Sequence, residues 1–169
     1  MGIKFGLWFE PEMTNKDSDL YRAHPDWILH TPGRNASHGR YQYVLDFSRK
    51  EVVEYIYEMM AKILSEAKVS YIKWDMNRSI TECYSVALPA DRQGEVFHRY
   101  ILGVYDLYER LTSEFPEVLF ESCSSGGGRF DPGMLYYAPQ GWTSDDSDAI
   151  ERLKIQYGTS LCYPISSMG

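Results

Sequence analysis

The sequence is poor in cysteine and has no long hydrophobic run. Its three cysteines, Cys83, Cys123 and Cys162, are an odd number at wide spacings, a pattern that predicts neither a disulfide framework nor a paired-cysteine metal or redox site. No apolar segment approaches the ~20 residues that span a bilayer, and the first residues lack the apolar core of a signal peptide. We therefore expect reduced thiols and a cytoplasmic protein.

Basic residues are outnumbered by acidic ones. The chain of 169 residues has 17 Lys and Arg against 24 Asp and Glu, a formal net charge of −7. Nucleic-acid phosphates and anionic membrane surfaces attract basic patches, and no run of Lys or Arg here is longer than two residues. We expect neither nucleic acid nor a membrane as a partner.

Motifs built on histidine, serine or a phosphate-binding loop are also missing. The four histidines form no HExxH motif or close pair, and no G-x-S-x-G segment is present. The glycines at 126–128 lack the spacing of a phosphate loop, and we expect Pro132 and Gly133 to delay any helix after them. The sequence thus indicates neither a metal nor an organic cofactor.

What the chain does have is an alternation of strand-like and helix-like segments. The expected strands lie at 4–10, 41–47, 71–75, 118–123 and 141–146, in short runs rich in aromatic and β-branched residues. The expected helices lie at about 48–68, at about 94–114 and from Asp148 onward, where apolar residues recur at helical spacing. Ser48 and Glu51 predict a capping box at the first helix. This alternation predicts an α/β fold with a parallel sheet.

Residues 11–40 form a long polar segment between two expected strands. A loop of such length in a compact domain is usually functional or disordered. Because it contains the apolar cluster Trp27, Ile28 and Leu29, we expect a folded, lid-like excursion.

Polar residues gather where the expected strands end. Trp8, Lys73, Asp75, Cys123 and Asp145 all stand there, and β/α barrels and open parallel sheets both place their active sites at that edge. Lys73 and Asp75 are two apart, so their side chains share one face of a strand. A solvated strand end with an incidental ion pair is the alternative. Two carboxylates on neighbouring strand ends are the minimal machinery of glycoside cleavage.

The acidic run at 145–148 has two further interpretations. It resembles the start of a calcium loop, but Ile150 stands where that loop needs glycine, and Gln156 where it needs glutamate. Asp148 is expected to cap the helix that follows. Asp145 then remains as the acid that can face Asp75.

Four longer motifs carry a resemblance to a known family. The segments LWFEPEM, KWDMNR, CSSGGGRFDPGMLYY and WTSDDSDAIERLKIQYGTSLCYPISSMG are together similar to glycoside hydrolase family 36, the bacterial-type α-galactosidases, over essentially all 169 residues. The resemblance implies a catalytic (β/α)8 barrel (TIM barrel). It also implies retaining hydrolysis of terminal α-linked galactose, as in melibiose or raffinose, through a covalent galactosyl-enzyme. No metal or cofactor is implied.

The resemblance also implies roles for individual residues. Asp75 matches the nucleophile and Asp145 the acid/base. The expected substrate-binding residues are Trp8, Arg40, Lys73, Asn77, Cys123, Gly126 and Trp142. The chemistry agrees: Lys73 beside Asp75 would keep that carboxylate ionised, and Trp142 beside Asp145 would favour a protonated acid there.

The resemblance covers only part of a family member. A full barrel needs about 250 residues, so we expect an incomplete barrel of about strands three to six, spanning residues 1–169. The flanking N-terminal β domain and C-terminal domain are expected to be absent, the parent protein to be a homo-oligomer, and the isolated chain to be weakly folded or inactive. Alternatives are an α-N-acetylgalactosaminidase, a raffinose-type galactosyl transferase and a non-catalytic carbohydrate-binding fragment.

Overall fold

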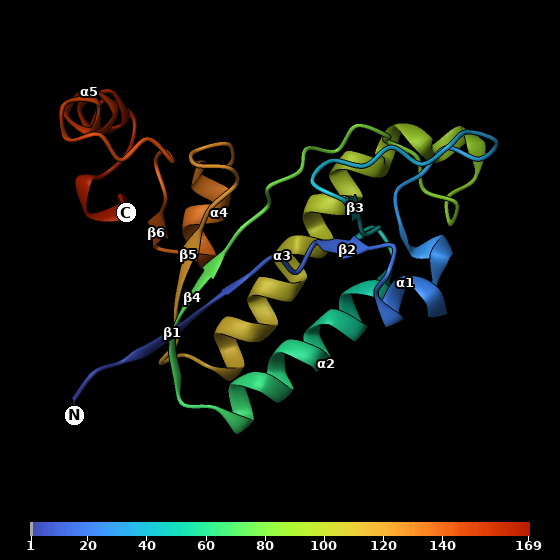
Figure 1. Ribbon diagram of the computed structural model, residues 1–169, viewed down its shortest axis with the longest axis horizontal. Helices are drawn as coiled ribbons and strands as arrows, with labels where there is room; N and C mark the ends of the chain where they lie inside the picture. Colours follow the sequence, from blue (N-terminus) through green and yellow to red (C-terminus); the bar gives the residue numbers. More distant parts are fainter. Residues whose placement is uncertain (1) are drawn as a thin grey trace.

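The centre of the molecule is a parallel four-stranded sheet in the order β1-β4-β5-β6 (Figure 1). The computed structural model describes residues 2–169. The strands are β1 (Phe5–Phe9), β4 (Val69–Trp74), β5 (Leu119–Ser122) and β6 (Gln140–Gly141). All neighbours are parallel and follow one another in chain order. The expected α/β class with a parallel sheet is confirmed.

Two long helices connect the strands and lie together beside the sheet (Figure 1). They are α2 (Lys50–Glu66) and α3 (Val96–Glu114), the latter preceded by the 3-10 turn η2 (Ala90–Glu95). The shorter α4 (Pro132–Tyr137) and α5 (Ala149–Ser160) follow β5 and β6, and the turn η3 (Ile165–Ser167) comes last. Each of α2 and α3 buries one stripe of side chains against the core, which confirms the expected amphipathic faces. None of the helices in residues 2–169 is both long and apolar enough to cross a bilayer.

The expected capping box at the start of α2 is wrong. The helix begins at Lys50, and its N-cap residue, Arg49, makes no side-chain cap. The Ser48 hydroxyl instead donates to the Asp46 carboxylate at 2.5 Å, while Glu51 accepts from Arg49 at 2.8 Å. A charged group is a stronger hydrogen-bond partner than a neutral main-chain group. Ser48 therefore bonds to the Asp46 carboxylate and Glu51 to the Arg49 guanidinium, and neither side chain caps the helix.

The two later helices start on aspartate caps. The Asp148 carboxylate accepts from the amides of Ile150 at 2.9 Å and Glu151 at 3.1 Å, as expected. Helix α4 differs from the sequence prediction that Pro132 and Gly133 delay a helix, because it begins at Pro132. Proline is well suited to the first helical position, and Asp131 caps this helix by accepting from the Met134 amide at 3.0 Å.

The segment before α2 forms a small unit of its own. It contains β2 (Met13–Asn15), α1 (Asp19–Ala23) and the 3-10 turn η1 (Pro25–Trp27). Strand β3 (Gln42–Val44) pairs with β2 in an antiparallel sheet, so the strand expected at 41–47 does not join the parallel sheet. Composition identified the strand but not its partner. Trp27, Ile28 and Leu29 are buried, which confirms the folded excursion.

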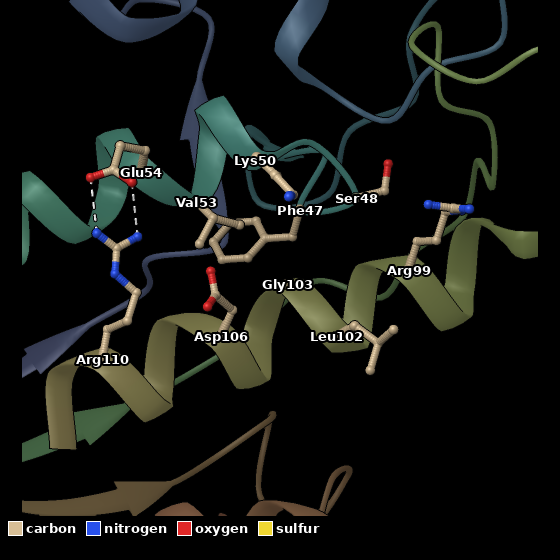
Figure 2. Close-up of a pocket in the computed structure, with 10 residues that line it drawn as sticks. All are labelled: Phe47, Ser48, Lys50, Val53, Glu54, Arg99, Leu102, Gly103, Asp106 and Arg110. Atoms are coloured by element: carbon tan, nitrogen blue, oxygen red, sulfur yellow. Dashed lines mark hydrogen bonds and ion pairs between the residues drawn. The ribbon is translucent and has the colours of Figure 1, made fainter. Parts of the chain in front are cut away.

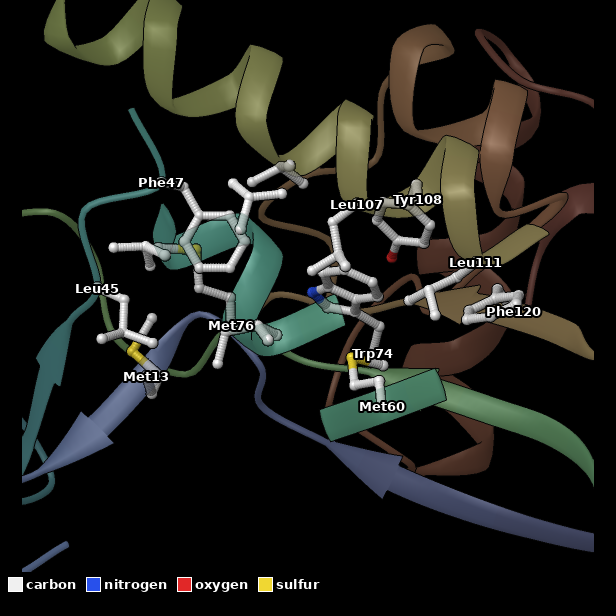
Figure 3. Close-up of a cluster of buried hydrophobic side chains, with 14 of the residues drawn as sticks. Met13, Leu45, Phe47, Met60, Trp74, Met76, Leu107, Tyr108, Leu111 and Phe120 are labelled. Carbon is white, nitrogen blue, oxygen red and sulfur yellow. The ribbon is translucent and has the colours of Figure 1, made fainter. Parts of the chain in front are cut away.

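Aromatic packing fixes β4 and β5 against α3 (Figure 3). Trp74 is fully buried and stacks on Tyr108 with 3.9 Å between ring centroids, and Phe120 meets the same tyrosine edge-on at 6.0 Å. Such aromatic pairs contribute about 0.5–1.5 kcal/mol beyond their burial. Because successive strand residues alternate between faces, Lys73 in β4 and Glu121 in β5 lie on the face that is turned away from α3.

A buried ion pair ties the segment after β1 to the segment after β5. The Arg129 guanidinium donates to both Glu12 oxygens at 2.9 and 2.8 Å, and Glu12 also accepts from the indole of Trp74 and the hydroxyl of Tyr100. Burial alone would lower the pKa of Arg129, but the Glu12 carboxylate raises it. Removing one partner of such a pair typically costs about 3–5 kcal/mol, so this contact anchors the glycine-rich segment that precedes Arg129.

Candidate active site

Sheet register places the expected residues in two rows near the carboxyl ends of the strands. In the first row, Trp8 lies opposite Lys73, Lys73 opposite Glu121, and Glu121 opposite Gln140. Neighbouring strands are about 4.8 Å apart, so side chains on the same face of this row are within contact distance.

The second row lies just beyond the strand ends. The main-chain amides of Asp75, Cys123 and Trp142 donate to the carbonyls of Phe9, Trp74 and Ser122 at 2.8, 2.7 and 2.8 Å. These bonds extend the ladder of the parallel sheet by one residue per strand. Asp75 and Cys123 are two residues beyond Lys73 and Glu121, so they continue the same face.

The Asp75 carboxylate is buried and accepts hydrogen bonds from four N–H groups. Its Oδ2 atom accepts from Trp8 Nε1 at 3.1 Å and from Asn77 Nδ2 at 2.7 Å. Its Oδ1 atom accepts from the main-chain amides of Met76 at 2.9 Å and Ser125 at 3.4 Å. The side chain is therefore held from β1, from β4 and from the turn after β5.

Opposing effects set the ionisation of Asp75. Burial raises the pKa of this carboxyl, but hydrogen bonds from Asn77, Cys123, Trp8 and the Met76 amide lower it more, so the net pKa lies below its usual value. A carboxylate kept ionised in this way is suited to act as a nucleophile or as the partner of a developing positive charge.

The sequence predicts that Lys73 pairs with Asp75, but the structure gives Lys73 other partners. Its ammonium is paired with Glu121 Oε1 at 2.8 Å and lies 3.8 Å from the centroid of the Trp142 ring. The expected pairing of Lys73 with Asp75 is therefore wrong. Residues two apart on a strand are separated by about 6.6 Å along the chain, whereas a lateral neighbour is only about 4.8 Å away, so Glu121 is the closer partner.

Cys123 is a buried, neutral thiol. Burial raises its pKa to about 12, and its hydrogen bond with the Asp75 carboxylate acts in the same direction. A thiol in this state donates a hydrogen bond and is a poor nucleophile. Cys123 is therefore suited to pack in the site and not to attack a substrate.

One glycine-rich turn contacts both halves of the site. Ser125, with a φ of 47°, presents its amide to Asp75, while Gly126, with a φ of +83°, lies against the next segment. A Cβ atom on Gly126 would lie 3.0 Å from Ser144 Cα and 3.1 Å from the Asp145 amide nitrogen. Two consecutive residues of the turn thus contact the segments of Asp75 and Asp145.

Asp145 stands in a very different environment. It is exposed, and the Trp142 indole donates to its Oδ1 at 2.9 Å. The strand expected at 141–146 is shorter than predicted, since β6 ends at Gly141 and the segment carrying Asp145 is irregular. The sheet pairing of Trp142 nevertheless fixes the start of that segment.

Arg40 contacts the site through Glu10, a residue that the sequence analysis did not assign to the site. Glu10, which directly follows β1, accepts from the side chain of Asn77 at 2.7 Å and from its amide at 3.2 Å. The Arg40 guanidinium lies 3.9 Å from the same carboxylate oxygen and is otherwise largely exposed. An acid directly at a strand end was the available signal for Glu10. For Glu121 the signal was an acid inside the apolar run VLFESC.

A groove on the helical side of the molecule contains none of the expected site residues. It lies between α2 and α3 and is lined by residues such as Lys50, Arg99 and Asp106 (Figure 2). Arg110 and Glu54 form a two-armed ion pair across it at 3.0 and 2.9 Å. In residues 2–169, no group of three or more His, Cys, Asp or Glu side chains is arranged to hold a metal ion.

Comparison with known proteins identifies the family to which this chain belongs. The family model described as Melibiase matches residues 1–169, and the chain belongs to that family. The resemblance to glycoside hydrolase family 36 is confirmed, because similar solved structures are titled as members of it.

Individual relatives are α-galactosidases by name. AgaA of Geobacillus stearothermophilus is 62% identical over 169 residues, which are 100% of this chain and 23% of that protein. Mel36A of Lactobacillus acidophilus is 60% identical over 167 residues, 99% of this chain and 23% of that protein. The crystal structure of AgaA matches with a TM-score of 0.97 over 99% of this chain. Variants of AgaA have been crystallised with raffinose and with stachyose. The chain spans about a quarter of the length of these relatives.

Proposed function

We propose that this chain forms part of the catalytic (β/α)8 barrel of a retaining α-galactosidase. The four parallel strands would be consecutive strands of that barrel, about the third to the sixth, with the site at their carboxyl ends. The rest of the barrel, an N-terminal β domain and a C-terminal domain would lie in the remainder of a longer protein, which we expect to be a homo-oligomer. This reading is supported by family membership and by the short span of the relatives that the chain covers.

The reaction proceeds in two displacements. The ionised Asp75 carboxylate attacks the anomeric carbon of galactose, while Asp145 gives its proton to the departing glycosidic oxygen, so the bond to the leaving sugar breaks as the bond to Asp75 forms. Asp145, now ionised, then takes a proton from water. That water attacks the anomeric carbon and releases galactose from Asp75. Two inversions leave the α configuration unchanged.

The observation that carries the proposal is the set of donors around Asp75. Trp8, Asn77, Cys123 and the Met76 amide hold this carboxylate ionised in a buried position at a strand end, which is what a nucleophile at neutral pH requires. The AgaA complexes add support. One aspartate is replaced by Ala in the stachyose complex and another by Asn in the raffinose complex, 70 positions further along that chain. Residues 75 and 145 have the same separation here.

The remaining expected residues shape the sugar pocket. Trp8 is half-exposed and offers its ring to the apolar face of galactose. Lys73, Arg40 and Asn77 supply hydrogen-bond donors for hydroxyl groups. Cys123 and Gly126 keep the wall between the two carboxylates small, and Trp142 lines the side of the leaving group. The substrate class is α-galactoside oligosaccharides such as melibiose, raffinose and stachyose.

The proposal is tested by following hydrolysis of raffinose by the full-length protein with NMR. The α anomer of galactose is expected to appear first, with sucrose as the co-product, because a double displacement retains configuration. Initial release of β-galactose would show an inverting enzyme. Absence of hydrolysis, with galactose binding unaffected by Asp75→Ala, would instead support a non-catalytic carbohydrate-binding protein.

The same assay separates the neighbouring activities. An α-N-acetylgalactosaminidase would cleave the 2-acetamido substrate in preference to the galactoside, and a galactosyl transferase would return galactose to added sucrose faster than to water. Running the 169-residue chain alongside the full-length protein tests the expectation that the chain alone is inactive.

A further inference from the structure

Glu121 is a buried carboxylate that the two-step reaction does not use. It lies in β5, is 3% exposed, and is the register partner of Lys73 across the sheet. It shares the face that carries Asp75 and Cys123, one step further from the strand ends. Glu121 is therefore in the layer beneath the proposed sugar site.

Three neighbours hold the Glu121 carboxylate in one orientation. Oε1 is 2.8 Å from the Lys73 ammonium. Oε2 accepts from Gln140 Nε2 at 3.0 Å and from the Tyr71 hydroxyl. The two hydrogen bonds to Oε2 orient the carboxylate, and Oε1, which has no hydrogen-bond partner of its own, faces the ammonium as an ion pair. The carboxylate thus gives Lys73 a fixed counter-charge, which restrains the long lysine side chain at its charged end.

The restraint continues from Lys73 to Asp145. The ammonium lies 3.8 Å from the centre of the Trp142 ring, on its face, where a cation is attracted by the ring electrons. The Trp142 indole in turn donates to Asp145 Oδ1 at 2.9 Å. An unbroken series of contacts thus joins a buried acid in β5 to the exposed acid beyond β6.

We propose that Glu121 is a positioning residue for the acid/base. Its charge holds the Lys73 ammonium against the Trp142 ring, and the ring so placed directs its indole hydrogen bond to Asp145. The inference rests on the proposed role of Asp145. Without the Glu121 charge, the Lys73 ammonium beside the ring is uncompensated and no longer fixed in position. Trp142 then keeps the Arg152 guanidinium, 5.0 Å from its ring centroid, as its other cationic neighbour.

The test is Glu121→Gln in the full-length protein, with kcat and KM measured across pH on raffinose. We expect kcat to fall about 10-fold, part of the roughly 10²–10⁴-fold that acid–base catalysis contributes. The alkaline limb of kcat, which reports loss of the proton on the acid, should move to lower pH. The reason is that an uncompensated ammonium nearby favours the ionised form of a carboxyl. Hydrolysis of p-nitrophenyl α-D-galactopyranoside should fall less, since that leaving group needs little protonation.

Tyr71→Phe is the matched control. It removes a hydrogen bond to the other oxygen of the same carboxylate and leaves the Lys73 contact in place. We expect a lower melting temperature but no change in the pH at which kcat declines on the alkaline side. Glu121→Asp keeps the charge but withdraws it by one methylene, so the pH of its alkaline limb should lie between those of the unmodified protein and Glu121→Gln. This variant replaces Glu121→Gln if the latter does not fold.

Combining Glu121→Gln with Trp142→Phe tests whether Glu121 acts on Asp145 through the Trp142 ring. If Glu121 acts through the ring, the two losses in kcat should be clearly less than multiplicative when combined. Independent, multiplicative losses, or a limb that moves no more in Glu121→Gln than in Tyr71→Phe, would show that Glu121 is only structural. Failure of the unmodified protein to cleave raffinose would instead overturn the proposed function, so the two failures are distinct.

Discussion

The two proposed catalytic carboxylates are held in opposite ways. Asp75 is buried at the end of a strand with sheet neighbours on both sides, and donors from three parts of the chain reach it. Asp145 is exposed on an irregular segment, and one indole donates to its side chain. The difference fits the roles proposed for them. A nucleophile must stay ionised and fixed, whereas an acid/base exchanges its proton with water once per cycle and must remain accessible to it.

Replacing the fixed carboxylate should have the largest effect. Asp75→Asn keeps the shape but removes the attacking charge, so we expect kcat of the full-length protein to fall by at least roughly 10⁴-fold. The loss should be equally severe on raffinose and on p-nitrophenyl α-D-galactopyranoside, because both need the same attack. Steady-state kinetics on the two substrates check this, and retention of more than about 1% of kcat would remove Asp75 from the role of nucleophile.

Replacing the exposed carboxylate, Asp145, should affect raffinose and p-nitrophenyl α-D-galactopyranoside differently. Asp145→Asn removes the proton donor, so kcat on raffinose should fall by about 10²–10⁴-fold. The first displacement on the p-nitrophenyl substrate should be nearly unaffected, because p-nitrophenolate leaves without protonation, and a burst of p-nitrophenol should mark it. Stopped-flow measurement of that burst checks the prediction. An equal first-step loss on both substrates would contradict the assignment.

A change at the turn between the carboxylates should disturb both. Gly126→Ala places a Cβ atom 3.0 Å from Ser144 Cα on a residue with a φ of +83°, a backbone region that costs other residues about 1–2 kcal/mol. We expect a comparable fall in the free energy of unfolding, and losses in kcat on both substrates. Gly94→Ala is the control, since nothing lies within 4 Å of the added atom. Urea unfolding of the two variants measures the contrast, and equal stability would show that the turn is not tightly fitted.

The smallest predicted effect sharpens the account of Asp75. Trp8→Phe keeps an aromatic ring but removes one donor that lowers the Asp75 pKa. That pKa should rise toward its usual value, so the acidic decline of kcat/KM should begin at higher pH, by up to about one pH unit for one hydrogen bond. The pH profile of kcat/KM provides the measurement. Trp142→Phe, which contacts Asp145 and not Asp75, should leave that limb unmoved.

Local sequence determined much of this protein. The motifs around Asp75 and Asp145 identified the family, and the apolar segments predicted β1, β4, β5, α2 and α3 close to their observed ends and the start of α5. The strand expected at 141–146 was too long, because β6 ends at Gly141. Even the cap at Asp148 was readable, because it depends only on residues within one helical turn. Closeness in the chain was not always sufficient, because the capping box at Ser48 and Glu51 was lost to the charges of Asp46 and Arg49, which are just as local.

Contacts between distant segments were decided only by the tertiary structure. Sequence spacing paired Lys73 with Asp75, but the sheet placed Glu121 at its side, and the excursion before α2 gave β3 a partner outside the main sheet. The donors that lower the pKa of Asp75 come from residues as far apart as Trp8 and Cys123. The physical reason is geometric. Adjacent strands bring side chains closer than two steps along one strand do, and which strands become adjacent is a property of the whole fold.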